Sequence, residues 1–263
     1  MKIYERIVRL NDEHVKLALE QQVRDASSRH DGGIANPHTG IPSPSHGGTA
    51  GHIASFASAL VVPESAYYRS QTLLEALERA IQYMLNRQHA DGTISLGGTN
   101  FHSPPDTGFV VAGLCQVYRV LEQHEWDALG HAVGQLRLFL ERTIPALTTG
   151  GCHTPNHRWV MTAALGSLYD IFGAAELRAR AERWLAEGMD CTEDGEWTER
   201  SNGIYNTVSN IMLYYTALFL DRKELLEHVR RNLQMMVYMV HHDGEVVTDY
   251  SDRQDFGMSH NLS

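Results

Sequence analysis

The chain has 263 residues, enough for one large domain, and its 43% hydrophobic and 21% charged residues are ordinary for a soluble globular protein. Its formal net charge of −10 argues against binding to nucleic acid, which requires a basic surface. The 3 cysteines are far apart and form no CxxC pair, so neither a disulfide scaffold nor a cysteine-based zinc site is expected. The first residues lack a signal-peptide core and no apolar run has membrane length, which predicts a cytoplasmic protein without a membrane partner.

The first half of the chain is predicted to be helical apart from one long loop. Residues 12–26 place apolar side chains at intervals of three and four, and residues 68–88 carry an amphipathic stripe. Residues 107–122 are almost wholly apolar, which is typical of a helix that is enclosed on most sides. Residues 31–51 contain three prolines and many Gly, Ser and His residues, so we expect a long loop there, of a kind that is usually functional.

The second half continues this pattern and alternates between amphipathic and apolar helices. Residues 157–172 and 204–220 are the apolar ones, and residues 244–248 suggest a short extended segment. The amphipathic helices are expected at residues 126–144, 174–188 and 223–241.

Turn signals recur along the chain at a nearly regular interval. They are Asp31-Gly32, Asp91-Gly92, Gly150-Gly151, Asp194-Gly195 and Asp243-Gly244. One turn roughly every fifty residues leaves room for two helices, which is typical of stacked helical hairpins. The sequence therefore predicts an all-α fold, an α/α toroid or an open arc of about five hairpins with inner and outer helices, in a single domain over residues 1–263. An open arc leaves apolar edges, so a homo-oligomer is also expected.

The loops that lead into the apolar helices carry unusual polar residues. In a hairpin toroid these loops gather at one mouth, where the free N–H groups of helix N-termini favour an anionic ligand. Asn156 and His157 can hold a carboxylate by hydrogen bonds, and the phenol of Tyr205 can move a proton. These three predicted catalytic residues suit β-elimination of a uronic-acid polymer, which removes a proton beside a carboxyl group. The predicted substrate-binding residues are Asn100, His102, Arg158, Trp159, Trp197, Arg200, Asn202, Tyr250 and Arg253.

Ordinary structural roles are also open for many of these residues. Asp106 and Asn156 could be helix N-caps, and Arg158 and Arg253 could be partners in ion pairs. The two tryptophans could pack in the core. The loop histidines have no spacing that identifies a metal site, and neither a metal nor a cofactor is predicted; these histidines are His38, His46 and His52.

The chain resembles the α/α-toroid polysaccharide lyases, especially the heparinase II/III-like and oligoalginate lyase group. The resemblance rests on Asn156-His157, on Tyr205 49 positions later, and on the Asp-Gly turns before the apolar helices. It covers roughly residues 60–255. Members of this group place an Asn, often followed by His, at the start of an inner helix, and a catalytic Tyr follows. They usually continue into a β-sandwich domain, so this chain is expected to correspond to the helical part of such a lyase.

The resemblance implies a carbon–oxygen lyase that acts on an acidic polysaccharide or oligosaccharide and needs no cofactor. Asn156 and His157 would neutralise the uronate carboxylate, and Arg158 or Arg200 would add positive charge. Tyr205 would act as base, as acid, or as both. The aromatic side chains expected to stack on sugar rings are Phe101, Trp159, Trp197 and Tyr250.

Two other functions stay open at this point. The first is a glycoside hydrolase on the same scaffold that acts on uronides, which would use Asp106 and a second carboxylate across a cleft. That second carboxylate would come from Glu199, Asp249 or Asp255. The second function is a non-catalytic helical-repeat module that binds acidic glycans or protein partners.

Overall fold

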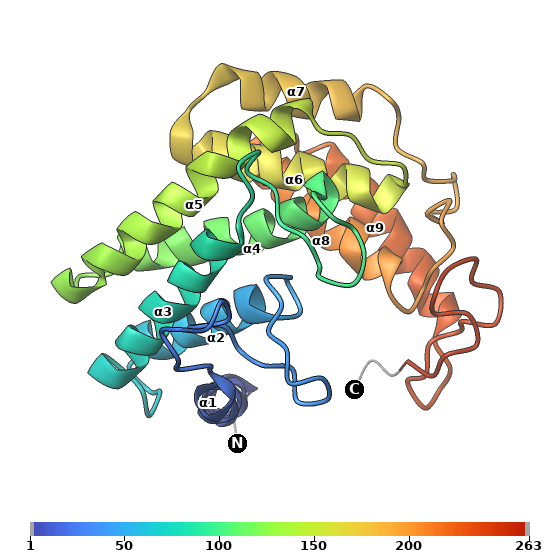
Figure 1. Cartoon of the computed structure of the whole chain (residues 1–263). Coiled ribbons are helices and arrows are strands. Elements are labelled where there is room, and N and C mark those ends of the chain that lie inside the picture. The colour runs from blue at the N-terminus through green and yellow to red at the C-terminus, as the bar shows by residue number, and fades with distance from the viewer. Residues whose placement is uncertain (1–2, 261–263) are drawn as a thin grey trace. The chain divides into compact units, whose positions relative to one another are not determined.

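The computed structural model describes residues 3–260, and these form helices that are joined by loops (Figure 1). Outside the helices, the pairing of the described backbone is limited to isolated bridges, one of which joins Val240 to Val246 in place of the extended segment expected at 244–248. The predicted all-α fold is therefore confirmed. The α-helices are α1 (Ile3–Gln21), α2 (Thr49–Val61), α3 (Gln71–Arg87), α4 (Pro104–Glu122), α5 (Gly130–Thr149), α6 (Pro155–Phe172), α7 (Ala175–Leu185), α8 (Tyr205–Phe219) and α9 (Leu225–Met236).

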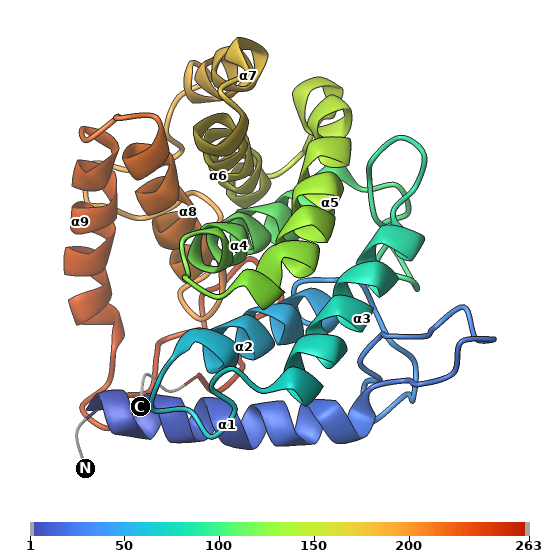
Figure 2. The ribbon, with the colours of Figure 1, turned by 90° about the vertical axis from the view of Figure 1, so that its left-hand side faces the viewer.

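The helices belong to two compact units, a first unit up to Thr149 and a second unit from Gly150. In the first unit α2 packs on α1, α3 and α4, while α5 packs on α3 and α4. In the second unit α6 packs on α7 and α8, and α8 lies beside α9 (Figure 2). No helix within residues 3–260 is both long and apolar enough to cross a membrane.

Enclosed and half-exposed helices alternate as far as α7, as the sequence predicts. Helix α4 buries residues around its whole circumference, and α6 is buried almost continuously from Arg158 to Leu168. By contrast, α3 and α9 each bury one face and expose the other. Helix α8, which was expected to be enclosed, also buries only one face, and it exposes Ile211, Tyr214 and Leu218 on the other.

Several helices differ from the predicted boundaries. Helix α1 covers Ile3–Gln21 where residues 12–26 were expected, because the apolar spacing begins well before Asp12. Helix α2 was not predicted, and its first residues fall in the expected loop 31–51, although Ile53, Phe56 and Leu60 form a buried apolar stripe. Helix α5 continues past Pro145 to Thr149, although a proline usually ends a helix.

Three of the four Asp-Gly turns, those at Gly32, Gly92 and Gly195, pack directly against the backbone of amphipathic helices. The glycines have positive φ angles, which residues with a side chain rarely adopt. A Cβ atom on them would meet a helix carbonyl oxygen, so only glycine fits. That Cβ would lie 2.1 Å from the Arg79 oxygen at Gly32, 2.0 Å from the Arg142 oxygen at Gly92 and 2.5 Å from the Arg231 oxygen at Gly195.

Side-chain amides fasten each of these turns to the same helix. Nε2 of Gln22 donates to the carbonyls of Gly32 and Ala76, at 3.1 and 2.8 Å. Nε2 of Gln88 repeats the arrangement and donates at 3.1 Å both to the turn glycine Gly92 and to Phe139. In the second unit Nδ2 of Asn232 donates to Gly195. The Asp-Gly repeat in the sequence therefore corresponds to a repeated turn–helix contact in the structure. Each contact fixes the point at which the loop after the turn begins.

We predict that Gly92→Ala destabilises the protein more than Gly97→Ala does. Both glycines have positive φ, so each change should cost about 1–2 kcal/mol in backbone strain. At Gly97 the added methyl meets nothing within 4 Å, whereas at Gly92 it overlaps the Arg142 carbonyl. We expect this overlap to lower the free energy of unfolding of Gly92→Ala by a further ~1–3 kcal/mol. Urea unfolding of both variants measures the difference, and equal losses would contradict the proposed contact.

Candidate functional site

The most densely bonded group of predicted site residues surrounds a buried carboxylate in the second unit. Glu199 is 8% exposed and lies in the turn before α8. Its two oxygens accept hydrogen bonds at 2.7 Å from the backbone N–H and from Nδ2 of Asn156, in the first turn of α6. Nη1 of Arg253, in the C-terminal loop, lies 3.1 Å from the same carboxylate. One carboxylate thus joins three segments that are far apart in the sequence.

The side-chain amide of Asn156 has a defined orientation in this cluster. Its Nδ2 must face Glu199, because a rotated amide would place its oxygen against the carboxylate. The Oδ1 atom is then buried, and no described residue donates to it. Thr154, and not Asn156, is the residue at the N-cap of α6. The structure therefore uses Asn156 to hold Glu199.

Tyr205 lies at the start of α8, beside Arg253. The guanidinium carbon of Arg253 is 4.7 Å from the centre of the Tyr205 ring, a cation–π distance. The phenol donates a hydrogen bond of 2.8 Å to Oε1 of Gln254. Tyr205 and Gln254 form an exposed contact, so solvent reaches the phenol. A phenol, a guanidinium and an amide therefore meet at one surface position.

A second buried carboxylate, that of Asp255, anchors the loop that carries Arg253 and Gln254. Asp255 is 0% exposed, and it accepts hydrogen bonds of 2.8 Å from the Ser201 hydroxyl, 2.6 Å from the Ser251 hydroxyl and 2.9 Å from the Gly203 N–H. Burial raises the pKa of Asp255, but these hydrogen bonds outweigh burial and leave the pKa below its ordinary value. Asp255 is therefore held as a charged anchor.

Asn202 and Tyr250, both predicted to bind substrate, hold the same two segments together. Nδ2 of Asn202 donates to the Val247 carbonyl at 3.0 Å and to the Tyr250 hydroxyl at 2.9 Å. Nδ2 of Asn206 donates in turn to Oδ1 of Asn202. Burial raises the pKa of Tyr250, which opposes loss of its proton. The observed contacts of Asn202 and Tyr250 are thus structural.

Several other predicted residues lie away from this cluster or beneath it. Trp159 and Trp197 are 0% and 2% exposed, so neither ring offers a face to a sugar in this conformation. Arg158 is buried and forms ion pairs with Glu187 and Asp190. Arg200 forms an exposed ion pair with Asp252, and His157 is half-buried in the first turn of α6.

Asn100 and His102 belong to the first unit, in the loop before α4. Nδ2 of Asn100 donates at 3.0 Å to the carboxylate of Asp106. The N-cap of α4 is Ser103, whose hydroxyl accepts from the backbone N–H of Asp106 and donates to its carboxylate. Asp106 is therefore the third helical residue and not the N-cap, because Pro104 takes the first helical position.

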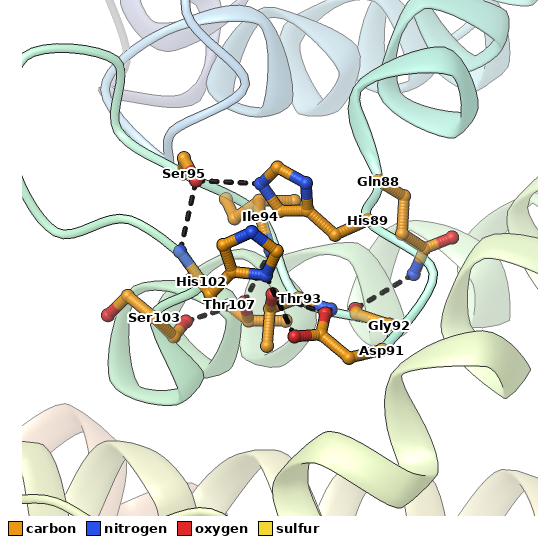
Figure 3. A network of polar contacts seen from close by, with 10 residues as sticks. All are labelled: Gln88, His89, Asp91, Gly92, Thr93, Ile94, Ser95, His102, Ser103 and Thr107. Carbon is orange, nitrogen blue, oxygen red and sulfur yellow. Dashed lines mark hydrogen bonds and ion pairs between the residues drawn. The ribbon is translucent and has the colours of Figure 1, made fainter.

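The ring of His102 completes a polar network with His89, Asp91 and Ser95 (Figure 3). Nδ1 of His102 lies 2.8 Å from the Asp91 carboxylate, and Nε2 of His89 lies 2.7 Å from the Ser95 hydroxyl. The two imidazole rings stack at 3.8 Å. Hydrogen bonding by the Thr93 hydroxyl is the largest cause that lowers the pKa of Asp91, to about 2. Asp91 is therefore charged at neutral pH.

No three His, Cys, Asp or Glu side chains within residues 3–260 come together in a way that could hold a metal ion. Of the three histidines that were expected in loops, His52 lies in helix α2, and both it and His46 have aromatic neighbours. His46 stacks on Phe109, and His52 lies edge-on to His14. Burial is the main cause that lowers the pKa of both His46 and His52, which disfavours their charged forms.

The comparisons with known proteins point to one fold. No family model matches the chain, and no curated protein matches it. Among solved structures, the chain is similar to the Streptomyces coelicolor A3 chondroitin AC lyase in complex with chondroitin sulphate, with a TM-score of 0.62 at 15% sequence identity. The match covers 95% of this chain and 35% of that chain. At this identity the similarity shows the fold, which is that of an α/α-toroid lyase.

We predict that Asp255→Asn lowers stability at neutral pH and that the loss is pH-dependent. Asparagine removes the charge and replaces one of the two accepting oxygens by a donor, so the loss should be about 1.5–3 kcal/mol. Because the folded pKa of Asp255 lies below its unfolded value of about 3.9, the carboxylate stabilises the protein above that pH. This contribution is lost as the pH falls through the folded pKa.

Urea unfolding of both proteins between about pH 6 and pH 2 checks this prediction. The difference in the free energy of unfolding between wild type and Asp255→Asn should be largest at pH 6 and should decrease as the pH falls. Asp249→Asn, an exposed aspartate of the same loop, is the matched control and should change little. A difference in the free energy of unfolding that does not change with pH would contradict a charged Asp255 in the folded protein.

Proposed function

We propose that this chain cleaves a uronic-acid-containing polysaccharide by β-elimination. The fold is that of an α/α-toroid polysaccharide lyase, which supports the class of reaction and an acidic polysaccharide as substrate. The observation that carries the proposal is the contact between the Tyr205 phenol and the Arg253 guanidinium, which Glu199 and Asn156 hold in place.

Tyr205 is the proposed proton-transfer residue. In β-elimination the C5–H bond of the uronate breaks, its electron pair forms the C4–C5 double bond, and the bond from C4 to the glycosidic oxygen breaks. The leaving oxygen takes up a proton. A tyrosine that serves as base must carry a negative charge for part of the cycle, and the neighbouring Arg253 cation would stabilise that charge. Solvent access at the Tyr205–Gln254 contact would let a substrate displace Gln254.

The structure suggests a changed role for Asn156. Its amide and backbone N–H groups both serve Glu199, so we assign it to positioning: Asn156 holds Glu199, and Glu199 holds Arg253. Neutralisation of the substrate carboxylate then falls to Arg253 and to His157. Hydrogen bonds from such groups strengthen as negative charge develops on the carboxylate.

Three of the four carboxylates considered for a hydrolase are engaged in contacts within the protein. Asp106 accepts hydrogen bonds from Ser103 and Asn100, and Asp255 is fully buried. Glu199 is held by Asn156 and Arg253. Asp249 is exposed, but a hydrolase needs a second carboxylate across the cleft. These contacts support elimination over hydrolysis.

We predict that Tyr205→Phe lowers the turnover of a uronic-acid polysaccharide by about 10²–10⁴-fold, the range for loss of a general acid or base. Chondroitin sulphate is the first substrate to test. The unsaturated uronate product absorbs in the ultraviolet, so its appearance measures the reaction. The variant should fold normally, because the hydrogen bond that it loses is an exposed one to the Gln254 side chain.

Tyr214→Phe, the same substitution at an exposed position of α8, is the matched control and should keep full activity. A trace without the ultraviolet chromophore, accompanied by new reducing ends, would indicate hydrolysis and overturn the proposal. Wild-type protein that yields neither signal from any uronic-acid polymer would favour a binding module instead.

A further inference from the structure

Two segments of the first unit bring cationic and polar side chains together. On α3, Tyr83 and Arg87 are four residues apart, so they lie on the same face of the helix. The turn of residues 28–33 packs on this face, since a Cβ atom on Gly33 would lie 2.9 Å from the Tyr83 ring. The resulting group, called the arginine cluster below, consists of Arg29, His30, Tyr83 and Arg87.

Three buried polar atoms of the arginine cluster have no hydrogen-bond partner among the described residues. They are the Tyr83 hydroxyl oxygen, Nδ1 of His30 and Nε of Arg87. The Nε–H of Arg29 donates at 3.2 Å to Nε2 of His30, so the neutral imidazole carries its proton on Nδ1. Each of the three atoms therefore carries a hydrogen that it can donate. A buried donor costs free energy unless an acceptor reaches it.

The charges that act on these donors are positive. Burial is the largest cause that lowers the pKa of His30, and the cations of Arg29 and Arg87 lower it further, so the ring is uncharged at neutral pH. Burial raises the pKa of Tyr83, and the same two arginines oppose that rise. Within residues 3–260 neither Arg29 nor Arg87 forms an ion pair with a carboxylate. Two unpaired cations thus stand together on a chain whose formal net charge is −10.

We propose that the arginine cluster binds a small tetrahedral oxyanion, either sulphate or phosphate. The N–H groups of a guanidinium match the oxygens of such an ion in geometry, and the hydrogen bonds are charge-assisted. Four oxygens on one ion can accept from donors on both segments at once. The nearby carboxylate of Asp31 does not take this role, because it lies 3.6 Å from Nη1 of Arg79 and accepts from the Asp25 N–H at 2.9 Å.

The ion that fits this position is free in solution and not an ester on a polymer. The contact between Arg29 and His30 is exposed, so a small ion enters where that contact opens. The three donor atoms are themselves closed to solvent, which keeps a sulphate group on a polysaccharide chain away from them. Binding of a free oxyanion at the arginine cluster does not depend on lyase activity.

The test is calorimetry of inorganic sulphate and of inorganic phosphate with the full chain, in chloride buffer of constant ionic strength. Wild type should bind one ion. Arg87→Gln should weaken binding by about 10–100-fold, the loss expected for a charge-assisted hydrogen bond. Arg142→Gln, at an exposed arginine of α5, is the matched control and should bind the ion like wild type.

Tyr83→Phe keeps the shape of the buried ring and removes only the hydroxyl, so it tests the site even if Arg87→Gln fails to fold. It should bind sulphate about 2–10-fold more weakly than wild type. In buffer without sulphate or phosphate it should unfold at the same temperature as wild type or at a higher one, because it loses a buried hydroxyl that has no acceptor. A lower unfolding temperature would mean that the hydroxyl bonds within the protein, which would overturn the site.

Two further results would contradict the proposal. Wild type that binds neither ion, or binding that both Arg87→Gln and Tyr83→Phe leave unchanged, would rule out the arginine cluster as the site. A chondroitin sulphate disaccharide should not compete with inorganic sulphate for wild type. Competition that Arg87→Gln abolishes would show that the cluster takes a sulphate ester and would overturn the assignment to a free ion.

Discussion

The close approach of a turn glycine to a helix carbonyl is the constraint on which the rest of this structure depends. At Gly32, Gly92 and Gly195 the backbone comes so near a neighbouring helix that no side chain fits. Amides of Gln22, Gln88 and Asn232 then fasten each turn. Because the helices fix these turns, the loop after each turn starts from a defined point. The loops that carry the candidate site residues can therefore be irregular and still be well placed.

Buried carboxylates supply the second level of order. Asp255 ties the C-terminal loop to the turn before α8, and Glu199 ties that turn to the start of α6 and to Arg253. A buried charge is costly unless it is paired and hydrogen-bonded, and here every carboxylate oxygen has a partner. As a result, Tyr205 and Arg253, which lie far apart in the sequence, are in contact near the protein surface. The positions of Tyr205 and Arg253 at the surface are therefore set by the buried carboxylates of Glu199 and Asp255.

Prediction from sequence succeeded where a residue's environment depends on its near neighbours in the chain. Helix α8 begins at Tyr205, one residue from the predicted start, because an apolar pattern with a period of 3.6 is local information. Helix α2 was missed although Ile53, Phe56 and Leu60 form a buried apolar stripe, because its first turn lies in a segment rich in Gly, Ser and Pro that indicates a loop. The N-cap of α4 is Ser103 and not Asp106, which the sequence analysis had considered, because Pro104 and Pro105 occupy the first two helical positions.

The sequence by itself determined the all-α class, the alternation of enclosed and amphipathic helices as far as α7, and the positions of the turns, since periodicity and glycine conformation are properties of short segments. The tertiary structure alone decided which polar residues are buried and which remain at the surface. Glu199 meets Asn156 across 43 residues of chain, and Asp255 meets Ser201 across 54. From the sequence, one polar loop cannot be told from another. Whether a carboxylate in such a loop is buried depends on the hydrogen-bond donors that distant segments of the chain place around it. For the same reason Trp159 became core and Phe101 stayed exposed: each ring's surroundings come from packing that its own segment does not encode.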